Sequence, residues 1–487
     1  MRPRISEAPI PLPSLIRSRR ALLYLLVACC AILIENQDEI LKGLGWGECD
    51  RITLPVRMLY QRFATVSHTM RSHRVWIVSY SERDFPSIAN PCSKRAFTAA
   101  IITRLAQFSP SVIAVDHWYS PDRCNLGKED PERSGELTAA IRTVSTTTRI
   151  VIGADSDSWE ELSEDELSAL RQRGFSPGDQ IVNPPEPTLA PTEFNSDNVR
   201  SALVRLNCDN RRIPLLWHVY LDRKHIPNNA VMATSLALET ARIDQSTLTP
   251  ALNSRVRSRQ YPSSIGEGES SSLKNGSSID RLIADRQHPF TGFMGESEFS
   301  PLRDGQLLTA SALLCGSNVQ GTALAMKDWS HCNGAKPEDL AKLRSTVIVI
   351  GQNIDSDQHK SVLGTVPGYL LHANYIDALL SDFYFRPLNP WAELGLTLLA
   401  VFSLAAVFEL AGPLWKRFLI ALSTLLFIIV ACNLVEMYFH LFLGFWLALV
   451  PVPFFEALFY LRGSTKPSYL TPSLHVGGSF DPRSGML

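Results

Sequence analysis

The chain has 487 residues and a formal net charge of −1, with 47 Lys and Arg residues against 48 Asp and Glu residues. This balance provides no basic field for a phosphate backbone, so the sequence argues against nucleic acid as a partner. Hydrophobic residues make up 45% of the chain and charged residues 20%, which is ordinary for a globular protein. The apolar residues gather at the two ends, and this distribution favours a membrane protein.

The first apolar run follows a group of arginines near the N-terminus. RSRR at 17–20 precedes the uncharged stretch ALLYLLVACCAILI at 21–34, and such a flank is typical of a signal sequence or signal anchor. The run is shorter than the roughly 20 residues that span a bilayer comfortably. We expect a transmembrane segment or signal anchor at 21–39. LVAC at 26–29 leaves a lipoprotein cleavage site as an alternative.

Residues 75–154 alternate between strand patterns and helix patterns. The β-branched runs VWIVSY, SVIAVD and RIVIGA are separated by two stretches in which apolar residues recur every three or four positions. The helical stripes consist of Phe97, Ile101, Leu105 and Phe108, and of Leu137, Ala140, Ile141 and Val144. Strands that alternate with helices in this way predict an α/β domain with a mainly parallel sheet and right-handed crossovers.

The middle of the chain mixes regular and irregular segments. The acidic and proline-rich stretch 160–200 predicts an irregular excursion, and the polar stretch 245–280 predicts a flexible insertion. Between them, RRIPLLWHVYL at 211–221 predicts a strand and AVMATSLALETAR at 230–242 predicts a helix. HPFTGFMG at 288–295 predicts a weak strand.

The last part of the outer domain leads to three long apolar runs. PEDLAKLRSTVIVIG at 337–351 predicts a short helix running into a strand, and LHANYIDALLSD at 371–382 predicts a helix leading towards the membrane. Three near-bilayer-length stretches follow at about 391–411, 418–435 and 438–461. Together with the N-terminal segment they predict a transmembrane base of four α-helices.

The positions of the basic residues predict the orientation of this base. Arginines before the first segment, Lys416 and Arg417 between later segments, and Arg462 after the last all fit the cytoplasmic side. The segments expected are a cytoplasmic N-terminus at 1–20, the first membrane segment at 21–39, an extracytoplasmic domain at 40–388 that includes the flexible insertion 245–280, three transmembrane helices at 389–462 and a cytoplasmic tail at 463–487.

Titratable residues follow three of the predicted strands. Because the carboxyl ends of parallel strands share one edge of a sheet, these groups are expected to converge there as a ligand-binding set. The set comprises Glu82 and Asp84 after the first strand, Asp116 and His117 after the second, and Asp357 and His359 after the strand VIVIG. Carboxylate and imidazole groups also suit a divalent metal, while polar loop residues often only cap turns.

Six cysteines lie in the predicted outer domain, which permits disulfides in an oxidising compartment. Cys92 and Cys124 lie in loops on the same expected edge and form the preferred pair, with Cys315 and Cys332 as further candidates. The connectivity is not readable from the sequence alone.

Several motifs together resemble the second type of CHASE-type extracytoplasmic sensor domain. They are VIAVDHWYSP, NCDNRRIPLL, HPFTGF, STVIVIG, DQHKSVLG and VPGYLLHANYIDALLSDFYFRP. The resemblance implies an outward-facing sensory role, with the family's aspartate at Asp116 and its Asp-x-His at Asp357 and His359. It also implies that Pro367, Gly368, His372 and Asn374 couple the domain to the membrane. The chain departs from the family at YSERD after the first strand, and the residues after Leu461 are too few for a cytoplasmic output domain.

These observations predict a sensor without enzymatic activity in a bacterial inner membrane, with its large domain in the periplasm. No G-x-S-x-G, P-loop or dinucleotide-binding glycine motif is present. The expected partners are the lipid bilayer, an unknown small-molecule or protein signal, a separate signalling partner and a second copy of the chain. No cofactor is expected. The alternatives are a periplasmic metal-dependent hydrolase that uses Asp116, Asp357 and His359, and a structural membrane protein that has lost its ligand.

Overall fold

The computed structural model describes a set of segments that carries most of the outer domain and two long helices after it. The described residues are 74–82, 91–119, 131–154, 156–157, 168, 180–182, 198–206, 212–221, 231–245, 264–265, 278–285, 289, 306–316, 333–361, 364–410 and 413–443. The N-terminal segment 21–39 and the tail 463–487 lie outside them.

A six-stranded sheet in which every neighbouring pair is parallel forms the centre of the outer domain. The strand order is β10 (Leu307–Thr309), β1 (Val75–Tyr80), β11 (Val347–Gln352), β2 (Val112–Trp118), β3 (Arg149–Ala154) and β6 (Val199–Leu203). These strands are apolar on both faces, as expected for a parallel sheet that is covered on both sides. The predicted α/β fold with a mainly parallel sheet is therefore confirmed.

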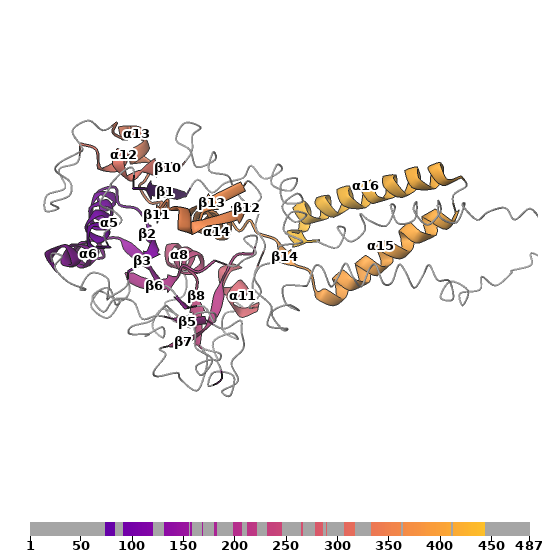
Figure 1. Ribbon diagram of the computed structural model, residues 1–487, viewed down its shortest axis with the longest axis horizontal. Coiled ribbons are helices and arrows are strands. Elements are labelled where there is room, and N and C mark those ends of the chain that lie inside the picture. The colour runs from indigo at the N-terminus through magenta and orange to yellow at the C-terminus, as the bar shows by residue number, and fades with distance from the viewer. Residues whose placement is uncertain are drawn as a thin grey trace, which may run out of the picture. The chain divides into compact units, whose positions relative to one another are not determined.

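Helices cover both faces of this sheet (Figure 1). One face packs against α5 (Pro91–Ala106), α6 (Pro131–Val144) and α12 (Ala310–Leu314). The other packs against α8 (Leu236–Asp244) and α14 (Gly368–Leu380). Alternate residues of each strand enter the two cores, so Val75 and Ile77 face one layer while Trp76 and Val78 face the other. The short α13 (Pro337–Ala341) precedes β11.

A second sheet corrects two expectations from the sequence. Its order is β4 (Ser156–Asp157), β5 (Gln180–Val182), β7 (Leu216–Leu221), β8 (Val231–Thr234) and β9 (Ser264–Ile265). The helix predicted from residue 230 begins only at Leu236, because VMAT pairs with β7 as a strand and Ser235 then caps the helix through its side chain. The strand predicted over 211–221 begins only at Leu216.

The predicted flexible insertion 245–280 is also wrong in part. β9 lies within it and pairs with β8 through backbone groups, which requires no apolar side chains. At its end, α11 (Ser278–Asp285) begins, and its Ile279 is fully buried in the same core as α14. The rest of the insertion lies outside the described residues, as do most of the excursion 160–200 and most of HPFTGFMG.

The chain after α14 belongs to two compact units. The larger contains the chain from the central sheet to Glu393 together with Ala431–Gly444, and the smaller contains Leu394–Val430. Two long helices occupy this region, α15 (Pro390–Leu410) and α16 (Leu414–Phe439). Within the described part of the chain, no helix combines the length and the apolar character needed to cross a membrane. The predicted transmembrane base stays a prediction.

The larger unit also contains a contact between two segments far apart in the sequence. The two-residue strands β14 (Arg386–Pro387) and β15 (Leu441–Phe442) pair in parallel, and the Arg386 N–H donates to the His440 carbonyl at 2.8 Å. The His440 ring stacks edge-on against Phe383 with the ring centroids 5.5 Å apart, and Phe385 is next to both. We call the contact formed by residues 383–387 and 440–442 the clasp.

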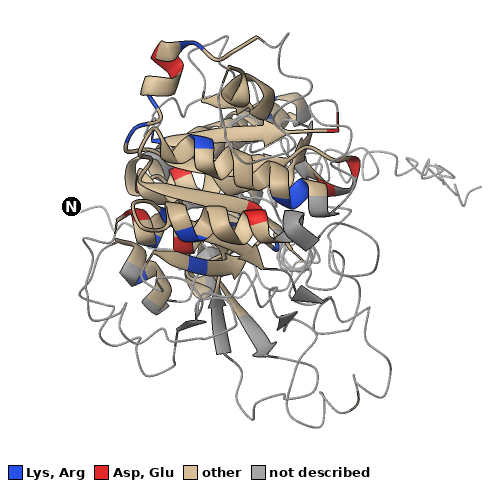
Figure 2. Ribbon diagram, turned by 90° about the vertical axis from the view of Figure 1, so that its left-hand side faces the viewer, with Lys and Arg blue, Asp and Glu red and all other residues tan. Residues whose placement is uncertain are grey.

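In the described residues coloured in Figure 2, Lys and Arg do not separate from Asp and Glu along the ribbon. Lys, Arg, Asp and Glu are scattered with both signs over the described helices and strands, and most of the ribbon carries neither. This distribution agrees with the nearly balanced charge of the sequence.

Candidate ligand-binding site

An irregularity in β2 places the first two site residues. The pairing of β2 with β3 shifts between Val115 and Trp118, so Asp116 and His117 are extra residues in a bulge. Gly153 of β3 allows this bulge, because a Cβ at Gly153 would lie only 2.7 Å from the His117 carbonyl oxygen. Asp116 and His117 were predicted in a loop after the strand. The structure corrects this, since β2 continues through them to Trp118.

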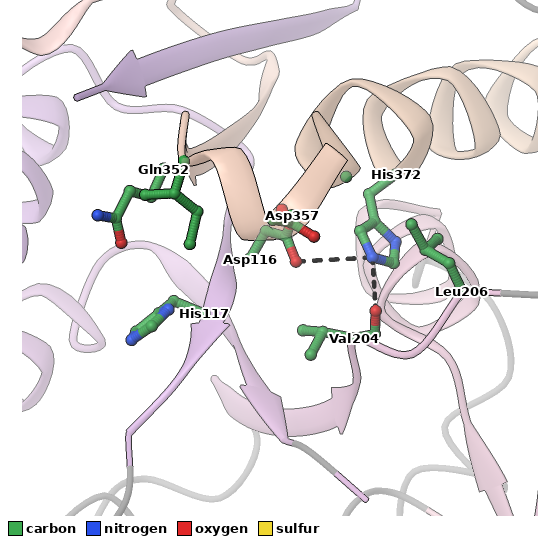
Figure 3. A pocket seen from close by; sticks show the side chains of 9 residues that line it. Asp116, His117, Val204, Leu206, Gln352, Asp357 and His372 are labelled. Carbon is green, nitrogen blue, oxygen red and sulfur yellow. Dashed lines mark hydrogen bonds and ion pairs between the residues drawn. The ribbon is translucent and has the colours of Figure 1, made fainter. Parts of the chain in front are cut away.

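A pocket of about 210 Å³ opens at the carboxyl edge of the central sheet (Figure 3). Its wall combines β2, the chain after β6, the end of β11 with the loop that follows, and the first turns of α14. The lining residues are Asp116, His117, Val204, Leu206, Gln352, Ile354, Asp357, Gly368 and His372. Acidic and polar groups therefore meet a small apolar surface in one place.

His372 of α14 is held in a neutral form. Its side chain is 1% exposed, and its Nε2–H donates to the Val204 carbonyl at 2.9 Å. Burial lowers the pKa of His372 to about 4, although the Val204 carbonyl and the charge of Asp357 act in the opposite direction. With its one proton on Nε2, the ring leaves Nδ1 as an acceptor, and this buried atom has no hydrogen-bond partner.

Asp116 lies beside His372 at the base of the pocket, with its Oδ1 3.5 Å from the imidazole Nε2 and its side chain 8% exposed. Figure 3 shows the two side chains facing each other across the pocket. Burial raises the pKa of Asp116 well above its usual value, and the negative charge of Asp357 adds to the effect. Lys94 opposes it. Burial and the charge of Asp357 thus both disfavour the charged form of Asp116.

Asp357 enters the pocket from the loop after β11. It ends the 3-10 turn η9 (Asp355–Asp357), and the hairpin of β12 (Gln358–Ser361) and β13 (Gly364–Pro367) follows directly. Its carboxylate lies over the start of α14, where a Cβ at Gly368 would be 2.8 Å from both oxygens. A glycine is needed for this approach, and a negative charge is favourable at the N-terminus of a helix. His359 contacts the same carboxylate, with its Nε2 3.0 Å from Asp357 Oδ1.

His117 is supported from α5 on the side away from His372. The Nζ of Lys94 lies 2.9 Å from His117 Nδ1. Behind it, Tyr119 donates to the Thr98 hydroxyl at 2.8 Å, and Thr98 donates to the Lys94 carbonyl at 2.9 Å. The Tyr119 ring also packs edge-on against His117. These contacts hold the bulged end of β2 against α5.

The structure treats the predicted ligand-binding residues in four different ways. Asp116, His117 and Asp357 line the pocket, while His359 contacts Asp357 without lining it. Glu82 is exposed and does not line the pocket. Asp84 lies outside the described residues.

The residues predicted to couple the domain to the membrane lie in the first half of α14 or directly before it. Pro367 is the residue before the helix, and Asn374 is buried within it. Gly368 and His372 line the pocket itself. Two of the residues predicted for coupling thus line the candidate pocket.

Only two of the four cysteines predicted to form disulfides are among the described residues. Cys315 is disulfide-bonded, but Cys332 and Cys124 lie outside the described residues. Cys92 lies in the first turn of α5 rather than in a loop, and its side chain is not described. A Cβ at Gly334 would be 3.5 Å from the Cys315 sulfur, so the chain two residues after Cys332 passes close to Cys315. This proximity supports the pairing of Cys315 with Cys332, which stays a prediction.

Among the described side chains, no group of three His, Cys, Asp or Glu residues is placed to hold a metal ion. Asp116, Asp357 and His359 are all described, so this statement includes the trio that the hydrolase alternative requires.

Sequence reasoning missed several residues of the pocket wall. Val204 and Leu206 follow β6, which was not recognised as a strand because it adjoins the irregular stretch 160–200. The run VRSALV at 199–204 was the signal that could have revealed it. Gln352 was passed over because it is the last residue of β11 and is not titratable.

The order of these elements along the chain can be compared with known families. The CHASE2 domain model matches residues 27–408. This chain belongs to the CHASE2 domain family. The predicted resemblance is thereby confirmed, and it assigns the chain to a family of sensory domains. No curated protein and no solved structure matches the chain. The pocket described above is a feature of this CHASE2 domain's own residues.

Proposed function

We propose that this protein is a membrane-anchored sensor whose CHASE2 domain binds a small extracytoplasmic ligand in the Asp116 pocket. Binding is passed along α14 and through the clasp to the helices that follow, where a separate partner reads it. The domain lies in the periplasm of a bacterium, and the chain is held in the inner membrane. The protein performs no chemical reaction on its ligand.

The observation that carries the proposal is the position of α14. Its first residue, Gly368, and its second turn, with His372, line the pocket. Its last residue, Leu380, is followed within a few residues by Phe383 and the rest of the clasp. A ligand that moves the start of α14 can therefore shift a rigid, fully packed helix whose other end adjoins the clasp. Packed elements change between discrete arrangements, so a small shift at the start of α14 can produce a full change of position at its other end.

The exposed side chains of α15 and α16 support the membrane part of the proposal. Large apolar residues more than a third exposed occur among the described residues only between positions 391 and 439. They are Trp391, Leu396, Leu399, Phe402, Trp415, Leu419, Ile420, Leu422, Leu426, Phe427, Val430, Leu434, Tyr438 and Phe439. Continuous apolar surface of this kind is unfavourable in water and marks a contact with lipid or another protein.

The signalling step is tested by hydrogen exchange on the full chain in lipid nanodiscs. A panel of small amines, carboxylic acids and alcohols is first screened for compounds that raise the melting temperature. We expect such a compound to change exchange in residues 383–387 and 440–443 of the wild type. Leu206→Trp, which fills the pocket, should abolish both effects. A compound that is blocked by Leu206→Trp but leaves exchange at the clasp unchanged would refute signal transfer.

Membrane anchoring is tested separately by extraction of cell membranes with alkaline carbonate. An anchored chain stays in the pellet, whereas a chain held only by peripheral contacts is released. Recovery of the full chain in the supernatant would refute the anchoring without affecting the binding proposal.

A further inference from the structure

Carboxyl groups are the main hydrogen-bond acceptors that line the pocket. The His372 Nε2–H beside Asp116 is already directed to the Val204 carbonyl at 2.9 Å. Asp116 is thus nine-tenths buried and lines the pocket with no short hydrogen bond. Asp357 adds a second carboxyl group on the same wall.

Two neutral groups in the same wall also have unused acceptors. Gln352 is 7% exposed, and its Oε1 has no hydrogen-bond partner. The Nδ1 of His372 is likewise buried without a partner. Both atoms are inaccessible from the cavity, so the contacts open to a ligand are those of the carboxyl groups of Asp116 and Asp357.

The nearby basic residues contact other groups of the protein. Lys94 contacts His117 Nδ1 at 2.9 Å and is not part of the pocket wall, while His359 contacts the Asp357 carboxylate at 3.0 Å. No Lys or Arg side chain lines the pocket. The two carboxyl groups therefore face the cavity without a cation inside it, and a positive ligand would relieve their mutual repulsion.

The size and the apolar part of the wall narrow the ligand further. Val204, Leu206 and Ile354 line the pocket beside the acceptors, and a cavity of about 210 Å³ suits a small ligand of about the size of benzene or slightly larger. The described side chains form no group suited to a metal ion. An organic cation with a short hydrocarbon body satisfies both walls, since its N–H groups donate while its carbons contact the apolar residues.

We propose that the CHASE2 pocket binds a small primary amine in its protonated form, with the ammonium group donating to Asp116 and Asp357 and the alkyl body against Val204, Leu206 and Ile354. This assignment rests on the proposed function, because it names the chemical class of the signal that the sensor receives.

The binding is coupled to a proton. Burial raises the pKa of Asp116 in the empty pocket, and the charge of an ammonium group beside it lowers that pKa again. A proton that Asp116 carries before binding is therefore released more readily when the amine binds. The affinity for an alkylammonium ion should rise with pH across the range in which Asp116 is protonated in the free protein, as long as the amine itself stays protonated.

The test uses the full chain in detergent micelles and calorimetric titration with a series from methylamine to hexylamine at pH 7. Isobutylamine is compared with isobutanol and isovalerate, which have nearly the same shape without the positive charge. We expect at least one amine to bind about tenfold or more tightly than its neutral and anionic counterparts. Heats measured in buffers of different ionisation enthalpy should reveal proton release.

The variants are chosen so that folding is preserved. Asp116→Asn keeps the shape of the side chain but removes the carboxylate, and it should abolish the preference for amines. Asp355→Asn is the matched control, since Asp355 is exposed in the same loop and does not line the pocket. It should bind amines as the wild type does. Circular dichroism and melting curves confirm that each variant is folded.

The proposal is overturned if no amine binds, if isobutanol or isovalerate binds equally well, or if Asp116→Asn keeps the preference. These results are distinguishable from a failure of the sensor proposal. An acid or alcohol that binds and changes exchange at the clasp would replace the amine while leaving the sensor intact. An amine that binds through Asp116 without changing exchange at the clasp would leave the site intact and remove the signalling.

Discussion

Gly351 determines how closely the end of β11 approaches α14. A Cβ at this position would lie 2.1 Å from the Cβ of Tyr369 and 2.3 Å from its Cγ. Tyr369 is fully buried in the first turn of α14, so it cannot move aside. We expect Gly351→Ala to destabilise the domain by about 1–3 kcal/mol through overpacking, measured by urea unfolding of the full chain.

Gly135 provides the matched control for this substitution. It lies in the middle of α6, and a Cβ there would meet no atom within 4 Å. Gly135→Ala should stabilise the chain by about 0.5–1 kcal/mol, because alanine is favoured over glycine inside a helix. Equal effects of the two substitutions would show that the close approach at Gly351 carries no energetic weight.

His372 makes the stability of the domain sensitive to acid. The pKa of His372 is lowered from 6.5 to about 4 by burial, so its contribution is complete above the unfolded value and is lost as the pH falls below it. Between pH 7 and pH 5 this loss amounts to about 2 kcal/mol. His372→Gln keeps a donor for the Val204 carbonyl without a titrating ring. We expect it to lose less stability between these pH values, as measured by urea midpoints.

Other groups also titrate in this range, so the free energy of unfolding of His372→Gln will still change with pH. The test is therefore the difference between the pH dependence of the variant and that of the wild type. Asp116 has the opposite effect on the free energy of unfolding. Its pKa is raised in the folded protein, so its contribution to the stability of the domain decreases as the pH rises. An identical acid dependence in wild type and His372→Gln would contradict the assignment to His372.

At the scale of elements, the clasp joins the end of α14 to the chain after α16. Phe385 is 7% exposed and lies beside Phe383 and His440. Phe385→Ala removes a buried ring and should lower the free energy of unfolding by about 3–5 kcal/mol if the site cannot collapse. It should also increase hydrogen exchange at residues 440–443 in the full chain.

Phe427 is the control for this substitution. Its side chain is 72% exposed on α16, so Phe427→Ala removes a ring of the same size from outside the clasp. Exchange at residues 440–443 should stay as in the wild type. Increased exchange in both variants would mean that the clasp is not the contact that protects this segment.

The spacing of apolar residues correctly predicted the strands that are buried on both faces. It gave the wrong secondary structure where a short segment becomes a strand only by pairing with another strand. β1, β2, β3 and β11 are apolar on both faces and were recognised from their β-branched runs. VMAT was assigned to a helix because its apolar residues adjoin those of α8. Whether such a short run pairs with β7 depends on residues far away in the sequence, which no local pattern contains.

At the scale of the whole molecule, the order of strands and helices predicted that three of the candidate residues would lie together at one edge of the sheet. The carboxyl edge of a parallel sheet is the common place for a ligand, and Asp116, His117 and Asp357 do line a pocket there. The depth of each residue was not predictable. Asp116 is buried because a bulge in β2 turns it inward, and a bulge leaves no mark in the apolar pattern of a strand.

Residues that were predicted to have separate roles in binding and in coupling lie together at the start of α14. His372 and Gly368 were assigned to coupling and Asp357 to binding, yet all three line one cavity. The reason is the tight turn from η9 through the β12–β13 hairpin, which brings the chain back to its starting point. Spacing along the sequence does not show such a return.

The clasp also restricts which movements the two long helices can make. α15 begins three residues after β14, and β15 begins two residues after the end of α16. The pairing of β14 with β15 therefore gives the start of one helix and the end of the other a common anchor. While β14 and β15 stay paired, the start of α15 and the end of α16 cannot move apart from each other. A shared tilt, a rotation or a displacement along the helix axes is still allowed. A signal that passes through α15 and α16 would therefore move the anchored ends of both helices together.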